Sequence, residues 1–313
     1  MVKKVLKITG IIVLILILIF VLLTVYSLHK PAAPDSYWNR IDSTGAVESR
    51  YLTLGPYAVQ TKKYEAPQDE SDKADSYYQV WYPEEAGVYP LVVMVNGTGV
   101  PCNKYEAVFQ HFASFGYVVI GNNYGTNWDG RHASETLQFA LDTEEIASMI
   151  DPDKIAIGGH SQGGMGTFNA ITEYDNGALY KAAFSLSPTN DELAIGLQWG
   201  FDLGTDQEYA FRLDQIQIPM LIAAGTGSFD SETVSPLAKM QEEFSSLAGD
   251  KVIFRRSDDV DHGAILYEVN GYVIAWLDYY LKGVSENESA FYGDGAELSE
   301  NPRYQDYQAE MTE

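Results

Sequence analysis

The chain has 313 residues and is strongly acidic, with 44 Asp and Glu against 20 Lys and Arg. This balance excludes a nucleic acid partner, since phosphates need a basic face, and it disfavours docking on an anionic lipid surface. The length is sufficient for one α/β domain with a large core, or for two smaller domains. The single cysteine, Cys102, can form neither an internal disulfide nor a Cys-rich zinc cluster, so we expect a small buried side chain there.

The N-terminus carries a long apolar segment. Three lysines precede an uncharged run of 21 residues from Ile8 to Leu28. As a helix this run would span about 31 Å, enough to cross a membrane, whereas the apolar core of a signal peptide has about 7 to 15 residues. With the lysines on the cytosolic side, the pattern predicts a single-pass transmembrane signal anchor in residues 1–30 and a catalytic domain outside the cytosol. A cleaved signal peptide, and hence a secreted enzyme, is the alternative.

Strands and helices alternate along the body of the chain. Residues 31–75 form a juncture with short predicted strands at 51–54 and 57–60. Further strands are predicted at 77–83, 91–95, 117–120, 154–157, 182–186, 220–224 and 251–255. Helices are predicted at about 104–115, 134–150, after 161, at 236–247 and at 271–281. The alternation indicates an α/β fold with a mainly parallel twisted sheet flanked by helices over a catalytic core of residues 76–285, followed by an acidic C-terminal tail of residues 286–313.

One motif stands where such sheets place their sites, at the carboxyl end of a strand. Gly159-His160-Ser161-Gln162-Gly163 matches G-x-S-x-G, follows the predicted strand 154–157 and precedes a helix. This is the context of a nucleophile elbow, in which small neighbours allow a strained serine to project from a sharp turn. The motif predicts Ser161 as a nucleophile, and the alternative is a glycine-rich turn that only connects strand to helix.

The same residues resemble a known superfamily. Gly-His-Ser-Gln-Gly-Gly after Lys154-Ile155-Ala156-Ile157 is similar to the elbow of the α/β-hydrolases. The similarity is greatest to the branch of dienelactone-hydrolase-like, chlorophyllase-like and polyester-hydrolase or cutinase-like lipases, and it covers about residues 76–285. It implies an α/β-hydrolase fold and a triad in the chain order Ser, Asp or Glu, His.

A serine hydroxyl needs a base to become nucleophilic. Four of the five histidines are poorly placed, at the end of the apolar segment, inside a predicted helix, before the nucleophile or beside it: His29, His111, His132 and His160. The side chain next to Ser161 is expected to point away from it. His262 remains, in a loop after the last predicted strand, where the family places its base.

The base needs a carboxylate that fixes its tautomer. The family places this acid after the strand that corresponds here to residues 219–224. Asp230 is the first acid in that loop and is the predicted residue, with Glu232 as the second candidate. Three aspartates just before His262 lie too close to it in sequence for the usual geometry.

A tetrahedral intermediate also needs two amide donors. The backbone N–H of Gln162, directly after the nucleophile, is one, and the resemblance implies a second in the loop after strand 91–95. We assign Thr98 to that role, with Gly99 as the alternative. Asn96 departs from the His-Gly of many relatives, although a backbone donor tolerates this. Trp128 is predicted to line the substrate pocket, and core packing is its alternative.

These assignments predict a serine hydrolase that cleaves carboxylic esters of small-molecule, lipid or polymer type through an acyl-enzyme. We expect no cofactor and no metal, since the sequence has no Walker loop, dinucleotide fingerprint or cluster of metal ligands. An acyltransferase with the same triad and a non-catalytic binding protein of the same fold are the other classes considered.

Overall fold

The computed structural model describes residues 30–68, 75–201 and 212–312. In these ranges nine strands form a single sheet in the order β1-β2-β4-β3-β5-β6-β7-β8-β9. Their bounds are β1 (Val59–Glu65), β2 (Tyr77–Pro83), β3 (Tyr89–Val95), β4 (Val118–Asn122), β5 (Ile150–His160), β6 (Tyr180–Leu186), β7 (Met220–Gly225), β8 (Lys251–Arg256) and β9 (Tyr304–Glu310). Strands β3 to β8 pair in parallel, whereas β1, β2 and β9 pair antiparallel with their neighbours. The predicted mainly parallel sheet is thus confirmed.

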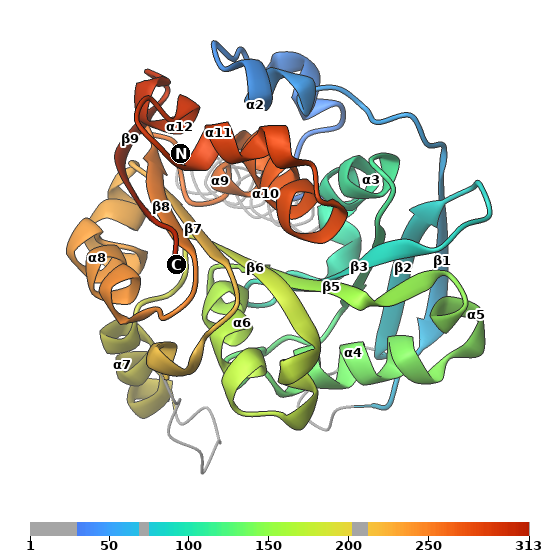
Figure 1. Ribbon diagram of the computed structural model, residues 1–313. Coiled ribbons are helices and arrows are strands. Elements are labelled where there is room, and N and C mark those ends of the chain that lie inside the picture. Colours follow the sequence, from blue (N-terminus) through green and yellow to red (C-terminus); the bar gives the residue numbers. More distant parts are fainter. Residues whose placement is uncertain (1–29, 69–74, 202–211, 313) are drawn as a thin grey trace, which may run out of the picture.

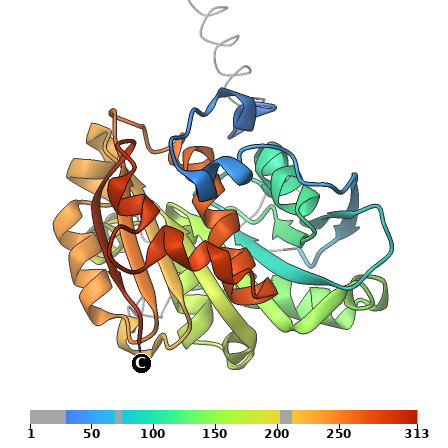
Figure 2. The same cartoon turned by 45° about the horizontal axis from the view of Figure 1, so that its top comes forward.

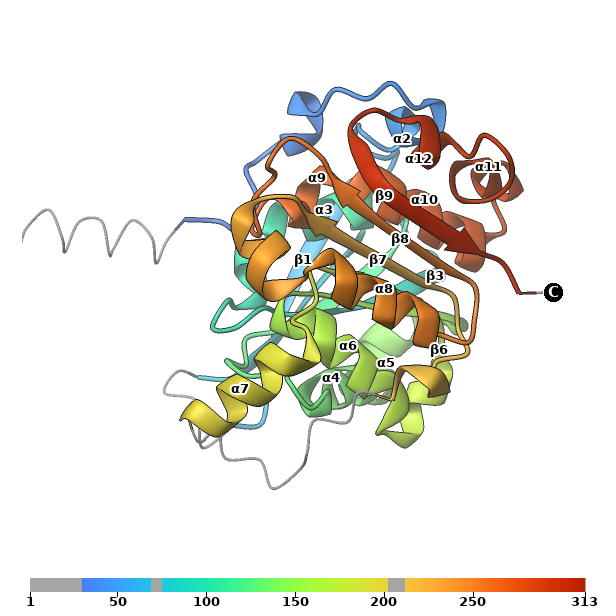
Figure 3. The same ribbon diagram turned by 90° about the vertical axis from the view of Figure 1, so that its left-hand side faces the viewer.

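Helices cover both faces of this sheet (Figure 1). Their bounds are α2 (Ala46–Arg50), α3 (Glu106–Ser114), α4 (Arg131–Asp142), α5 (Glu144–Ala147), α6 (Gln162–Thr172), α7 (Asp191–Phe201), α8 (Leu237–Ser246), α9 (Ile265–Glu268), α10 (Asn270–Lys282), α11 (Glu288–Phe291) and α12 (Glu297–Glu300). The views of Figures 1 and 3 show α3 and α10 on one face, and α4 and α6 on the other.

The core is split by the sheet into two layers because successive strand side chains point to opposite faces. In β3, Val92 and Met94 join the layer under α3 and α10, while Leu91, Val93 and Val95 join the layer under α4, α6 and α8. Each side of β3 is apolar, which explains why buried parallel strands read as continuous hydrophobic runs rather than alternating ones.

Residues 30–68, which the structure describes before the expected core, belong to the folded body. The predicted strand at 51–54 is wrong: α2 precedes it, and Tyr51 begins a turn. Tyr51 and Leu52 are buried at the core layer of α10, so their apolar character reflects tertiary packing and not strand pairing. The strand predicted at 57–60 appears further along as β1, which extends the sheet beyond the core boundary expected at residue 76.

The C-terminal residues 286–313, expected as an acidic tail, contain α11, α12 and β9 over the described part of the range. β9 pairs with β8 from Lys251↔Glu310 to Arg256↔Tyr304 and forms one edge of the sheet. Tyr304 is buried, and Tyr307 and Ala309 pack against the same core layer. Tyr307 and Ala309 alternate with polar residues, as in a half-buried strand, whereas Tyr304 stands three residues before Tyr307 because the ladder shifts register at this point. Figure 2 shows this segment beside α2.

The predicted transmembrane helix lies outside the described residues. In the ranges that the structure describes, no helix is both long enough and apolar enough to cross a membrane.

Candidate active site

Ser161 joins β5 to α6 in a backbone conformation that residues other than glycine rarely adopt. Its φ is 59° and its ψ is −123°, and its N–H donates to Leu186 O at 2.9 Å. The turn is possible only with glycine on both sides. A Cβ on Gly159 would lie 2.0 Å from Gly163 O, and one on Gly163 would lie 2.1 Å from Val95 O. Helix, strand and strained serine together have the form of a nucleophile elbow.

Asp230 and His262 meet at the carboxyl end of the sheet. Asp230 follows β7, is fully buried, and its Oδ1 lies 2.6 Å from His262 Nδ1. Its other oxygen, Oδ2, accepts hydrogen bonds from Ser187 Oγ at 2.6 Å and from Gly225 N at 2.9 Å. Burial opposes ionisation of Asp230, but the hydrogen bond and charge of His262, with these two donors, outweigh it and hold the pKa of the carboxyl below its usual range. Glu232, the second candidate, lies exposed.

A carboxylate on Nδ1 defines what the imidazole can do. The bond to Asp230 fixes Nδ1 as the protonated nitrogen and leaves Nε2 as the one that can accept a proton. The side chain of His262 is 18% exposed, so the ring is partly open to an incoming molecule.

His160 was set aside from the sequence, yet it contacts the loop of the expected base. Its Nε2 donates to His262 O at 2.7 Å, and the two ring centroids are 4.6 Å apart. Burial, reinforced by the nearby charge of His262, lowers the pKa of His160 to about 4, so its ring is neutral near pH 7. A sequence pattern cannot reveal this contact because the two histidines are 102 residues apart.

The remaining described histidines have other partners. His111 is fully buried between Tyr37 OH, at 2.6 Å from Nδ1, and Thr53 O, at 2.8 Å from Nε2. His132 stacks on Tyr124 with ring centroids 3.9 Å apart, and its Nδ1 lies 2.8 Å from Thr126 O. Each is a packed, hydrogen-bonded residue away from Asp230.

The expected amide donors lie in two different elements. Gln162 opens α6, where the first N–H groups have no partner within a helix. Its side chain is buried, and its Oε1 accepts the N–H of Asn127 at 3.0 Å. Thr98 lies exposed in the loop after β3. The alternative, Gly99, donates its own N–H to Gly125 O at 3.1 Å, which argues against it as an oxyanion donor.

Two aromatic side chains flank this region differently. Trp128 is 6% exposed and packs with Met165, Ala194 and Leu197. This favours core packing, and contact with substrate stays a prediction. Phe229, which the sequence analysis did not select, is 55% exposed, and its ring stands edge-on to His262 with centroids 5.2 Å apart.

Comparison with known proteins places the chain in a family. A family model described as Chlorophyllase matches residues 47–239. Chlorophyllase type 0 of Chenopodium album is 22% identical over 195 residues, which are 57% of this chain and 49% of that protein. Lipase 1 of Moraxella sp. (strain TA144) is 28% identical over 179 residues, or 54% of each chain. Cutinase cut1 of Thermobifida fusca is 24% identical over 276 residues, or 83% of this chain and 76% of the cutinase.

The chain thus spans about half the length of this chlorophyllase and this lipase. The resemblance to chlorophyllase-like and cutinase-like α/β-hydrolases is confirmed. Since the matching model covers more than half of the chain, this protein belongs to the chlorophyllase family.

Proposed function

We propose that this protein hydrolyses carboxylic esters through an acyl-enzyme on Ser161, with His262 as the base and Asp230 as the acid that orients it. The observation that carries the proposal is the 2.6 Å contact between Asp230 and His262, whose side chains are 32 residues apart in sequence. The contact lies at the carboxyl end of the sheet, as does the strained Ser161. Relatives named as cutinase, lipase and chlorophyllase support the same class of reaction.

The proposed reaction has two halves. The Ser161 oxygen attacks the ester carbonyl carbon as His262 Nε2 takes the hydroxyl proton, and the carbonyl oxygen becomes an oxyanion. The backbone N–H groups of Gln162 and Thr98 stabilise that charge. The intermediate collapses, the alcohol leaves with the proton from His262, and the acyl group stays on Ser161. Water then attacks the acyl carbon as His262 Nε2 takes its proton, the bond to the Ser161 oxygen breaks, and that proton returns to Ser161 as the acid leaves.

Substitution of the nucleophile tests the proposal. Ser161→Ala should retain the fold, because alanine is smaller than serine, and should lower kcat on p-nitrophenyl esters of rising chain length by about 10⁴- to 10⁶-fold. A fluorophosphonate probe should label the unsubstituted protein and not the variant. Retention of more than a tenth of the rate by Ser161→Ala would refute the assignment, and an acylated alcohol as main product would indicate an acyltransferase instead.

We also propose that residues 8–28 hold the enzyme at a membrane in a single pass, with the catalytic domain extracytoplasmic. The length of the run and the preceding lysines support this. The body begins almost immediately afterwards, since Ala32 N donates to Lys104 O at 2.8 Å and Ala33 is buried.

The full-length protein should therefore sediment with membranes and resist high-salt extraction, because the attachment is apolar. A chain beginning at Lys30 should be released and should keep its esterase activity. Recovery of active protein from the medium with a new N-terminus near residue 30 would show a cleaved signal peptide.

A further inference from the structure

The loop of residues 257–264, between β8 and α9, carries His262 and has a backbone that needs support. Asp258 and Asp259, four and three residues before the proposed base, have φ values of 66° and 52°. Two consecutive residues other than glycine in the left-handed region are uncommon, and such a conformation persists only where its surroundings hold it. Both side chains are exposed. Val260 O accepts the N–H of Gly227 at 2.9 Å in the middle of the loop, and Arg256 Nη1 lies 3.4 Å from Asp258 Oδ2, so the middle and the ends of the loop both support it.

The two ends of the loop are joined by an ion pair between largely buried side chains. Arg256 ends β8 and Glu268 ends α9, and Arg256 Nη2 lies 3.3 Å from Glu268 Oε2. Arg303, directly before β9, binds the start of the same loop through its backbone oxygen. Ser257 N donates to Arg303 O at 2.9 Å, and Arg256 Nη1 donates to that oxygen at 3.0 Å. The loop therefore leaves and re-enters the fold at one cross-linked position.

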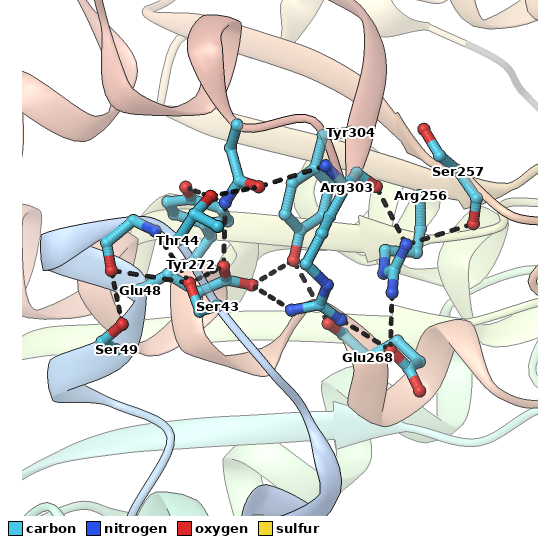
Figure 4. Close-up of polar contacts among 12 residues, drawn as sticks. Ser43, Thr44, Glu48, Ser49, Arg256, Ser257, Glu268, Tyr272, Arg303 and Tyr304 are labelled. Carbon is cyan, nitrogen blue, oxygen red and sulfur yellow. Dashed lines mark hydrogen bonds and ion pairs between the residues drawn. The ribbon is translucent and has the colours of Figure 1, made fainter.

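The ion pairs continue to the N-terminal helix α2 (Figure 4). Arg303 Nη2 lies 3.0 Å from Glu268 Oε2, and its Nη1 lies 3.4 Å from Glu48 Oε1. Glu48 is fully buried, and Tyr304 donates its hydroxyl to Glu48 and lies 3.2 Å from Glu268 O. The result is a chain of alternating charge, Arg256–Glu268–Arg303–Glu48, in which the four side chains are 8%, 22%, 13% and 0% exposed.

We propose that these four residues, the clasp, are positioning residues for the base: they hold the loop 257–264 closed and fasten it to α2, and so fix the place of the His262 ring. This inference rests on the proposed role of His262. The proposal goes beyond a general contribution to stability because it concerns the position of the base. Arg256 and Glu268 flank the loop that carries His262, and Arg303 and Glu48 connect this pair to α2.

Glu268→Gln tests the clasp at its centre. The substitution keeps the shape and an acceptor oxygen but removes the charge shared by two arginines, so that Arg303 is left with Glu48 and Arg256 with the exposed Asp258, 3.4 Å away. We expect kcat on a p-nitrophenyl ester to fall about 10- to 100-fold with KM nearly unchanged, because small displacements of a catalytic group act on the transition state and not on substrate binding. Glu268→Asp, which restores the carboxylate on a shorter side chain, should recover part of kcat.

A second readout does not depend on turnover. The Nδ1 proton shared with Asp230 at 2.6 Å should give a far-downfield proton resonance. In Glu268→Gln this resonance should broaden or disappear at temperatures where far-ultraviolet circular dichroism shows folded protein. If Glu268→Gln yields no folded protein, Glu48→Gln, at the far end of the clasp, is measured in the same way with the same expectations.

Asp278→Asn is the matched control. Asp278 lies in another buried cluster, on α10, where it accepts from Tyr51 OH at 2.9 Å and Tyr117 OH at 2.6 Å and pairs with Lys282 at 2.9 Å. It should lower Tm and leave kcat and the downfield resonance intact.

A lower Tm with unchanged kcat and resonance in Glu268→Gln would overturn the proposal and make the clasp purely structural. An equal loss of kcat in Asp278→Asn would overturn it as well. If the unsubstituted protein neither hydrolyses esters nor reacts with a fluorophosphonate, the proposed function fails, whereas the resonance still reports whether the clasp positions His262.

Discussion

At the scale of single residues, Asp230 shows how a site can be specified by few contacts. Three donors, His262, Ser187 and Gly225 N–H, share its two oxygens and favour the charged carboxylate. The pKa of Asp230 is held low by these bonds against the effect of burial. The acid therefore stays ionised across the range in which His262 can act as a base.

Asp230→Asn should consequently lower kcat by about 10⁴-fold, because an amide at this place favours the wrong tautomer of His262 while the shape is kept. Glu232→Gln should change kcat less than twofold, since Glu232 is exposed. Steady-state kinetics on one p-nitrophenyl ester decide between the two carboxylates, and the reverse pattern would reassign the acid.

The sequence allowed these assignments because a nucleophile elbow is a short local motif and because the order of the triad residues can be followed along the chain. Ser161 could be proposed from its neighbours, and Asp230 and His262 from the loops in which they fall. His160, Ser187 and Phe229 could not be selected in this way. Their contacts join different loops at the carboxyl end of the sheet, and no spacing in the sequence encodes them. The roles predicted for Trp128 and Thr98 have the weakest sequence signal, since an aromatic or a turn amide has the same sequence signature whether it packs or binds.

At the scale of elements, the buried parallel strands were the most predictable parts. Each is an apolar run between turn residues, as β7 and β8 illustrate. The edges were the least predictable. β9 consists mainly of Tyr, Gln, Asp and Glu and has few aliphatic residues, so its sequence resembles a solvated acidic segment. Only its pairing with β8 identifies it as a strand.

Removal of β9 therefore tests an element whose sequence suggested a tail. A chain that ends at Asn301 loses the ladder to β8, the buried Tyr304 and Arg303, and exposes an unpaired strand edge. We expect it to lose its cooperative thermal transition and to aggregate. A chain that ends at Glu310 keeps the strand and should melt within a few degrees of the full-length protein. Equal melting of both chains would show that β9 does not stabilise the fold.

At the scale of the whole molecule, two buried histidines make stability sensitive to acid. Burial lowers the pKa of His111, and that of His160, from 6.5 to about 4. Between pH 6.5 and 4 the unfolded chain binds a proton at each imidazole while the folded chain does not, so acidification favours unfolding over this window.

The free energy of unfolding, measured with urea at several pH values, should therefore fall from pH 6.5 to 4. In His111→Gln the decrease should be smaller, because one of the two titrations is removed, even if the variant is less stable at pH 7. Subtraction of the two curves cancels the carboxylates that both proteins share. A difference that stays constant with pH would mean that His111 does not titrate in this range.

The contacts of Glu48 also have a consequence in time. Its partners Asn301 and Tyr304 lie 253 and 256 residues further along the chain. During synthesis α2 is made first, and the groups that neutralise and cover its carboxylate follow only after about 250 further residues. Contacts of such long sequence separation form slowly, since a very large loop must close first. Helix α2 can therefore dock in this way only after residues 301–304 have been made, and until then this part of the surface is available to chaperones and proteases.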